Sequence, residues 1–574
     1  MDIVVGTKTN PIATEQLVEE LGRLDLGGTL YLGYPVLATP DEAVFVDALL
    51  VSEKQGLVIF HFPKDKPSDD TFWDEIEETQ NDLYAAITQK LIGFKPLREG
   101  RDLAFKPVVL CYMSYEVPVP ADKNDMVVTS DNLAAIVSRL QPISEQHFRA
   151  LQSAIQRVSS IKPSKRRASV QKPDSKGAVL KYIEREIANL DTWQNHAAIE
   201  TPDAPQCIRG LAGSGKTVVL ALKAAFLHAR NPNWNIAVTF HTRSLYQQFR
   251  NLIRRFSFEQ SRDEPDWSKL KIIHSWGSRT EPGVYSEIAL TSGVQPKTFE
   301  EARIQYGREA FGGICEELLG ISPKNPPPLY DVLMIDEAQD FPKSFFQMVY
   351  GKGVTHHHRI IWAYDELQNL GDYVVLPPEE LFGADGNGVP LVTLRNENGK
   401  PRQDIMLPVC YRNTPWALTI AHAVGFGVYR QGGLVQLFEN ASEAVWRRLG
   451  YSVVSGTIEI GHQVVLKRAE HSSPKYFYDL VSPEDSVSTT IFNSVQEQAK
   501  WVTESIKKNL TEDELEHSDI LVIFPEPLTV KSQASTLRNL LKSAWGAPIF
   551  STTYNERHPA FSTGCLTSVT WFFS

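Results

Sequence analysis

The run from Gly210 to Thr217, GLAGSGKT, matches the pattern G-x-x-x-x-G-K-[ST] of a phosphate-binding loop. Glycines permit a tight turn whose backbone N–H groups face the phosphates of a nucleotide. In such a loop Lys216 reaches the β- and γ-phosphates, and the Thr217 hydroxyl ligates Mg²⁺. The pattern therefore predicts a site for ATP and Mg²⁺, whose nucleotide-binding residues are Gly210, Gly213, Ser214, Gly215, Lys216 and Thr217.

A second chemical pattern follows the apolar run 329–335, which ends in two adjacent acids. If this run is a buried strand, Asp336 and Glu337 lie at its carboxyl end. Asp336 is then a candidate ligand of the Mg²⁺ that Thr217 also binds. Glu337 is a candidate base that orients and deprotonates the attacking water.

Three further polar residues complete the predicted site. The amide of Gln194 is both a donor and an acceptor, which suits the edge of an adenine ring. Gln368 follows the apolar run 360–364 and is a candidate sensor of the γ-phosphate. Arg412 is a candidate charge clamp on the same phosphate from a neighbouring domain. The candidate catalytic residues are thus Lys216, Glu337, Gln368 and Arg412.

Four more side chains are candidates for contact with nucleic acid. Thr239 and Phe240 end one predicted strand, 235–240, and His274 and Trp276 end another that begins at residue 272. Stacking of a base on an aromatic ring contributes ~1–3 kcal/mol. A place in the core explains both aromatic rings equally well.

The elements that must position these residues are those of an α/β fold. Short apolar runs precede each group of polar residues, and the composition after Thr217 favours a helix. The chain has 574 residues, which predicts three or more domains. Its formal net charge of −11 argues against binding of nucleic acid over most of its surface, but it does not exclude a local basic groove.

The compartment is predicted from what the sequence lacks. The five cysteines are scattered without a C-x-x-C pair, which is typical of a reducing compartment without structural zinc. The first residues lack the basic and apolar regions of a signal peptide, and no apolar run is long enough to span a bilayer. We expect a cytoplasmic protein that does not bind membranes.

Residues 1–158 predict a separate α/β domain, with a helix over 13–24 and strands over 31–37, 43–52 and 57–62. This order, with Asp47 on the second strand, resembles the PD-(D/E)xK restriction-endonuclease-like fold in its nuclease-related form. The resemblance implies that Asp47 binds Mg²⁺. The next strand departs from the pattern, because His61 and Pro63 stand where an acid and a lysine are needed. An inactive structural or recognition domain is therefore favoured over a nuclease.

Residues 159–178 predict a linker. The stretch from Ile161 to Lys176 is polar, contains two prolines, and carries six basic residues against one acid. A solvated connector and an arm that touches DNA phosphates are equally good interpretations.

Taken together, these motifs resemble the superfamily 1 DNA helicases of the UvrD/Rep/PcrA type. The matching segments are Gln194, Gly210–Thr217, Thr239–Ser244, His274–Trp276, Asp336–Asp340, Asp365–Gln368 and Tyr411–Arg412. The resemblance implies two RecA-like P-loop domains that bind ATP between them and move on single-stranded DNA, usually 3′ to 5′. We expect the first domain over 179–405, with an inserted subdomain at about 277–328. The second, partial domain is expected over 406–574, with a short insertion at about 425–490.

The last residues depart from this family. Phe561–Val569 resembles the lead-in to motif V, but the rest of motif V and the arginine of motif VI do not follow. We expect a shortened gene product, a trimmed chain, or a subunit completed by a partner protein or a second copy. The sequence predicts an ATP-dependent DNA helicase or translocase, in DNA repair or antiphage defence. The alternatives are an ATP- and DNA-binding regulatory or assembly subunit without unwinding activity, and a helicase–nuclease.

Overall fold

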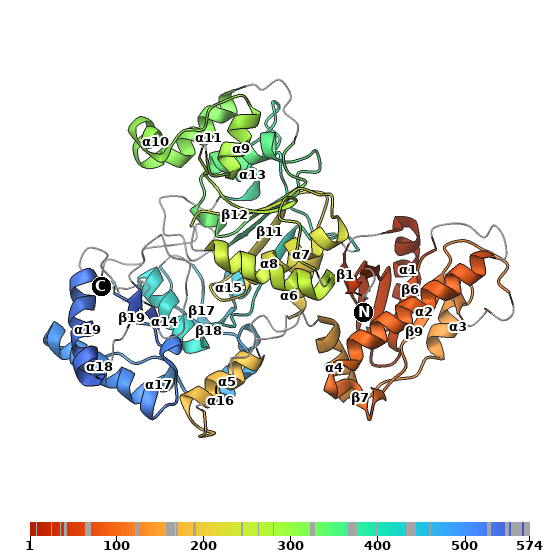
Figure 1. Ribbon diagram of the computed structural model, residues 1–574, viewed down its shortest axis with the longest axis horizontal. Helices are drawn as coiled ribbons and strands as arrows, with labels where there is room; N and C mark the ends of the chain where they lie inside the picture. Colours follow the sequence, from red (N-terminus) through yellow and green to blue (C-terminus); the bar gives the residue numbers. More distant parts are fainter. Residues whose placement is uncertain are drawn as a thin grey trace. The chain divides into compact units, whose positions relative to one another are not determined.

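A computed structural model gives the fold of the chain (Figure 1). It describes residues 1–6, 9–24, 26–34, 36–38, 43–63, 71–120, 123, 126–156, 167, 170–186, 191–242, 245–261, 263–278, 280–321, 328–365, 376–397, 399–428, 430–431, 443–459, 461–524, 530–545, 550–552 and 565–567. The chain divides into two compact units, one of residues 1–161 and 189–412, the other of residues 162–188 and 413–574.

The first unit begins with a six-stranded sheet of order β1-β2-β5-β6-β9-β10. Its strands are β1 (Asp2–Val5), β2 (Thr29–Leu32), β5 (Ala48–Ser52), β6 (Gly56–His61), β9 (Val108–Tyr112) and β10 (Val127–Val128). Strands β5 and β6 pair antiparallel and overlap the strands expected over 43–52 and 57–62, although β5 covers only the second half of the first. The expected strand over 31–37 is divided between β2 and β3 (Val36–Ala38), and β3 pairs instead with β4 (Ala43–Phe45).

Alternate residues of β5 pack on opposite faces of this sheet, as the two-residue period of a strand requires. Leu49 and Val51 join one apolar cluster with α2 (Thr71–Ile92) and α4 (Glu145–Gln156). Leu50 joins another with α1 (Pro11–Arg23) and α3 (Leu133–Ser138). The predicted helix over 13–24 is thus confirmed as α1, and the N-terminal region is a sheet covered by helices on both faces.

The second sheet of this unit is entirely parallel, with order β13-β12-β14-β15-β11-β16. Its strands are β11 (Gln206–Gly210), β12 (Ile236–Phe240), β13 (Leu270–His274), β14 (Val332–Ile335), β15 (Ile360–Tyr364) and β16 (Asp404–Leu407). Nearly every residue of these strands is buried, as in parallel sheets covered on both faces. The apolar runs that predicted strands before each motif are confirmed.

Helices cover both faces of the parallel sheet (Figure 1). On one face lie α7 (Lys216–Arg230) and α8 (Leu245–Ser261), whose apolar side chains pack on β11 and β12. On the other face lie α11 (Ala310–Gly320) and α12 (Lys343–Met348). The inserted subdomain predicted at 277–328 is helical, with α9 (Val284–Thr291) and α10 (Phe299–Tyr306) ahead of α11.

Two boundaries of this unit differ from those expected. Strand β16 pairs with β11, so residues 404–412 continue the first P-loop domain, whereas we expected that domain to end at 405. Residues 162–188, expected as a linker and the start of that domain, group with the second unit. Helix α5 (Lys176–Glu186) lies in this stretch.

The basic segment is anchored where the structure describes it. Arg167 is 2% exposed, and its guanidinium hydrogen-bonds Glu184 of α5 and Asp519. The backbone N–H groups of Gln171 and Lys172 donate to Glu514. We interpreted this segment as a solvated connector or as an arm that touches DNA phosphates. Both interpretations are wrong at Arg167, because its side chain is buried against two carboxylates.

The second unit contains α14 (Pro415–Phe426), α15 (Glu443–Arg448), α16 (Lys475–Leu480), α17 (Pro483–Ser486), α18 (Val495–Thr511) and α19 (Val530–Trp545). Strands β17 (Tyr451–Gly456) and β18 (Val464–Arg468) pair antiparallel, and β19 (Phe550–Thr552) pairs with β20 (Cys565–Thr567) in parallel. The run 519–524 contains the end of a 3-10 turn, His517–Asp519, and a single β-bridge residue at Leu521. Among the described residues of this unit the sheets are two-stranded, so the second RecA-like domain stays a prediction.

Candidate nucleotide-binding site

The phosphate loop joins β11 to α7 at the carboxyl end of the parallel sheet. Gly213 and Gly215 have φ of +84° and +90°, in the left-handed region that favours glycine. A Cβ on Gly213 would lie 2.5 Å from Arg412 Cβ, and one on Gly215 would lie 2.7 Å from Gln194 Nε2. Gly213 and the fixed motif glycine Gly215 are therefore required by backbone angle and by close neighbours.

The two predicted Mg²⁺ ligands lie together. Thr217 Oγ1 donates a 2.8 Å hydrogen bond to Asp336 Oδ2, across 119 residues of sequence. The other carboxylate oxygen, Asp336 Oδ1, is buried and has no hydrogen-bond partner. Burial, and then the charge of Glu337, raise the pKa of Asp336 to about 7. A hydroxyl beside a buried carboxylate with an unused oxygen fits Mg²⁺, which takes oxygen ligands and few of them from protein.

Lys216 lies at the same end of the sheet and is 7% exposed. Its ammonium donates to the carbonyl oxygens of Gly210 at 2.7 Å and Leu211 at 3.3 Å, and it lies 3.9 Å from the carboxylate of Asp365. A bound triphosphate would exchange the two carbonyl contacts for phosphate oxygens. The sequence placed Asp365 at the start of the segment Asp365–Gln368 without a role, although its place after an apolar strand is the signal that found Asp336.

Glu337 follows Asp336 in a left-handed backbone conformation, with φ of +50°. Non-glycine residues seldom adopt this angle, and those that do concentrate at functional sites. Gln339 Nε2 donates to Glu337 Oε2 at 2.7 Å, while Gln339 Oε1 accepts from the backbone N–H of Asp365 at 3.2 Å. Gln339 thereby holds the candidate base and joins it to the end of β15, a role that the sequence did not reveal.

Gln194 lies on α6 (Thr192–Ile199) in a capping box, in which Asp191 accepts from the backbone N–H of Gln194 and Gln194 Oε1 accepts from that of Asp191. Its Nε2 donates to the Ser214 carbonyl at 2.8 Å. The side-chain amide of Gln194 already hydrogen-bonds both the helix cap and the phosphate loop. Adenine would have to compete with these two contacts to bind it. The spacing D-x-x-Q is a recognisable cap signal in the sequence.

The segment ending at Arg412 also packs on the phosphate loop. Tyr411 N–H donates to the Gly213 carbonyl at 3.0 Å, and its hydroxyl donates to Asp191 at 2.5 Å. Arg412 was expected to reach the γ-phosphate from a neighbouring domain, but it belongs to the same compact unit as the loop. Gln368, the remaining candidate catalytic residue, lies outside the described residues.

The candidate nucleic-acid residues divide into buried and partly exposed groups. Thr239 and Phe240 are buried, and Phe240 stacks on Phe249 with ring centres 5.9 Å apart. Phe240 therefore belongs to the core, and the prediction that a base stacks on its ring is wrong. His274 and Trp276 are only partly buried.

His274 Nδ1 accepts from the Trp276 N–H, and its Nε2 donates to the His241 carbonyl. The Trp276 ring stacks on Phe311, with ring centres 5.2 Å apart, and its Nε1 donates to the Lys297 carbonyl. One face of this indole is thus covered by Phe311.

Asp47, the candidate nuclease acid, is engaged by its own domain. Its carboxylate accepts from the Phe62 N–H at 2.8 Å and from the Thr9 hydroxyl, and lies 3.2 Å from His61 Nδ1. Burial raises the pKa of Asp47, but these hydrogen bonds outweigh it and leave the pKa below its usual range. No group of three or more His, Cys, Asp or Glu side chains among the described residues is arranged to bind a metal.

Comparisons with known proteins give matches among solved structures alone. No protein-family model matches the chain, and no curated protein matches it. One solved structure to which it is similar is the DUF1998 helicase MrfA bound to DNA and AMPPNP, at 12% identity and a TM-score of 0.27. The match covers 68% of this chain and 40% of that chain, so this chain spans less than half of the protein it matches. Within the described residues, no helix has the length and apolar character to cross a membrane.

Proposed function

We propose that the chain is a single-stranded-DNA-stimulated ATPase, an ATP-dependent helicase or translocase of superfamily 1 that moves 3′ to 5′. The observation that supports this most is the 2.8 Å hydrogen bond between Thr217 and the buried Asp336, beside Lys216. These groups gather at the carboxyl end of a parallel sheet, where α/β proteins bind ligands.

In this mechanism each residue has a separate task. Lys216 binds the β- and γ-phosphates, and the backbone N–H groups of the loop support the remaining oxygens. Thr217 and Asp336 would hold Mg²⁺, which when bound would neutralise charge on the phosphates. Glu337, held by Gln339, orients the attacking water and accepts its proton. Gln368 and Arg412 couple the γ-phosphate to movement on DNA.

The test is ATP hydrolysis with and without single-stranded DNA. We expect the DNA to stimulate hydrolysis by wild-type protein and Lys216→Ala to abolish it. Comparable turnover in Lys216→Ala would refute the assignment.

A second candidate function is binding of ATP and DNA without unwinding, as a regulatory or assembly subunit. The two-stranded sheets among the described residues of the second unit favour it. A strand-displacement assay separates the two functions, because unwinding by this chain alone would exclude the second.

A helicase–nuclease is a third candidate and depends on Asp47. This is the weakest of the three candidates, because three groups of the domain already hydrogen-bond the Asp47 carboxylate. DNA cleavage that requires a divalent metal and is lost in Asp47→Ala would restore it, and no cleavage with any divalent metal would end it.

A further inference from the structure

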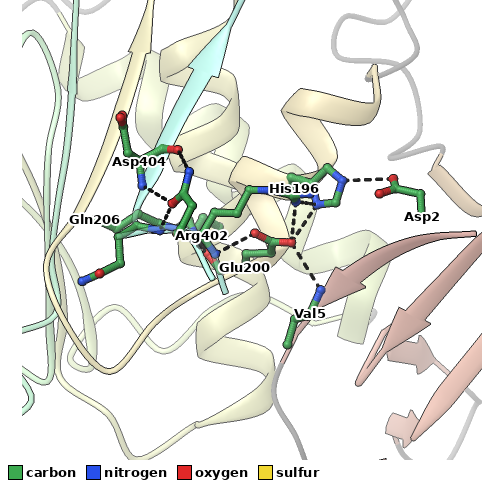
Figure 2. Close-up of polar contacts among 10 residues, drawn as sticks. Asp2, Val5, His196, Glu200, Gln206, Arg402 and Asp404 are labelled. Atoms are coloured by element: carbon green, nitrogen blue, oxygen red, sulfur yellow. Dashed lines mark hydrogen bonds and ion pairs between the residues drawn. The ribbon is translucent and has the colours of Figure 1, made fainter. Parts of the chain in front are cut away.

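A network of charged side chains joins the N-terminal sheet to helix α6 (Figure 2). At its centre is His196, which is 1% exposed. His196 Nε2 lies 3.1 Å from Asp2 Oδ2, on strand β1, and Nδ1 lies 2.7 Å from Glu200 Oε1. An imidazole between two carboxylates donates from both nitrogens when it is protonated. His196 therefore links a residue of β1 to the end of α6.

Glu200, which follows α6, accepts hydrogen bonds from three other segments (Figure 2). Arg402 donates to it from Nη1 and from the backbone N–H, both at 2.9 Å. The Val5 N–H, on β1, approaches the same carboxylate at 3.4 Å. Lys223 of α7 donates to the Glu200 carbonyl oxygen. The carboxyl end of α6 is thus held by β1, by α7 and by the segment before β16.

The amino end of the same helix carries Gln194, which donates to the Ser214 carbonyl of the phosphate loop. Helix α6 has only eight residues, so its two ends move together as one rigid element. A contact that fixes His196 also restrains Gln194, two residues earlier. The network and the phosphate loop are therefore connected through a single helix.

The N-terminal domain contacts the nucleotide-binding domain at two further places. Tyr34 packs edge-on against Phe226 of α7, with ring centres 5.9 Å apart. The guanidinium of Arg230, also on α7, lies 4.6 Å from the centre of the Phe45 ring. These contacts do not involve the charged network, so loss of the Asp2 carboxylate leaves the two domains in contact.

We propose that Asp2 and His196 are positioning residues for nucleotide binding, through which the N-terminal domain holds Gln194 against the phosphate loop. This inference rests on the proposed function, because it requires that the loop bind ATP. It gives the nuclease-like domain a role that does not depend on cleavage.

The experiment measures binding of a fluorescent ATP analogue to the full chain at equilibrium. Partly exposed ion pairs contribute ~0.2–1 kcal/mol, so Asp2→Asn is expected to weaken binding about 1.5- to 5-fold. Asp2→Glu, which keeps the charge, should restore most of the affinity. Asp2 is 40% exposed at its side chain, so its substitution leaves the fold intact.

The matched control is Glu19→Gln. It removes an exposed ion pair with Arg23 in the same domain, and should leave binding unchanged. In a Gln194→Ala background, Asp2→Asn should have no further effect, because the connection to the loop is already removed. A purely structural role of Asp2 would instead give the same loss in both backgrounds.

The outcomes separate the inference from the proposed function. If the wild-type chain does not bind the analogue, the proposed function fails and the inference fails with it. If it binds and Asp2→Asn binds equally well, only the inference is overturned. An undiminished effect of Asp2→Asn in the Gln194→Ala background would also overturn it.

Discussion

Asp336→Asn should stabilise the protein in the absence of Mg²⁺ while it destroys the metal site. The Asp336 carboxyl is fully buried, and desolvation followed by repulsion from Glu337 raises its pKa from 3.8 to about 7. Because the folded pKa lies above the unfolded one, the folded state binds this proton more tightly. Stability therefore falls as pH rises from about 4 to about 7, and the loss is complete above pH 7.

The size of the effect follows from that shift. Each pH unit corresponds to about 1.4 kcal/mol, so three units set an upper limit of about 4 kcal/mol. Relaxation around a buried charge reduces such penalties, and about 2 kcal/mol is the expected gain at pH 8. Asparagine keeps the oxygen that accepts from Thr217. At pH 4 the variant and the wild type should be nearly equal, because Asp336 is protonated.

Thermal unfolding in EDTA at pH 4 and pH 8 measures this difference, with the exposed Asp74→Asn as control. The chain has two compact units, and each can unfold in a transition of its own. The transition to follow is that of the first unit, which contains Asp336. The Asn variant should have the higher midpoint at pH 8 and should lose Mg²⁺-dependent nucleotide binding. A variant that is destabilised equally at both pH values would refute the electrostatic account of this site.

Three other substitutions give separate tests. Gly215→Ala puts a Cβ at φ of +90° and 2.7 Å from Gln194 Nε2, and a strain of ~1–2 kcal/mol in the nucleotide-bound loop should lower nucleotide affinity by about 5- to 30-fold; near-normal binding would contradict the loop geometry. Arg167→Ala leaves Glu184 and Asp519 without their buried partner and should destabilise the second unit by about 3–5 kcal/mol in chemical denaturation, whereas a mobile arm would give no change. Burial lowers the pKa of His196, but Asp2 and Glu200 outweigh it and raise the pKa overall, so its stabilising charge is present at low pH and is lost as pH rises through the folded pKa. His196→Gln should therefore cost more stability at pH 6 than at pH 8.5, and the reverse order would show that the ring is not charged in the folded state.

The elements around the phosphate loop were predictable from the sequence because two local signals agree. Each strand is a short apolar run, and each is followed by polar residues that mark its carboxyl end. Thr217 and Asp336 could be paired without a structure, since both belong to motifs whose chemistry requires a shared cation. The structure confirms this pairing at 2.8 Å.

Other features depend on contacts that are distant in sequence. Arg167 looks solvated in its basic segment, but it is buried against Glu184 and against Asp519, which is 352 residues away. Phe240 was equally suited to the core or to a base, and Phe249 on α8 decides for the core. Gln339 lies in the segment Asp336–Asp340 that resembles the helicase motif, whereas its hydrogen bonds to Glu337 and Asp365 required the fold.

The most direct test of the central claim is ATP hydrolysis by Glu337→Gln, measured with saturating single-stranded DNA and paired with nucleotide binding. Glutamine preserves an acceptor for Gln339 but does not accept a proton from water. We expect Mg·ATP binding within about threefold of wild type, because Glu337 does not hold the phosphates, and hydrolysis reduced by ~10²–10⁴. Hydrolysis at the wild-type rate in this variant would contradict the assignment of this site as the ATPase centre.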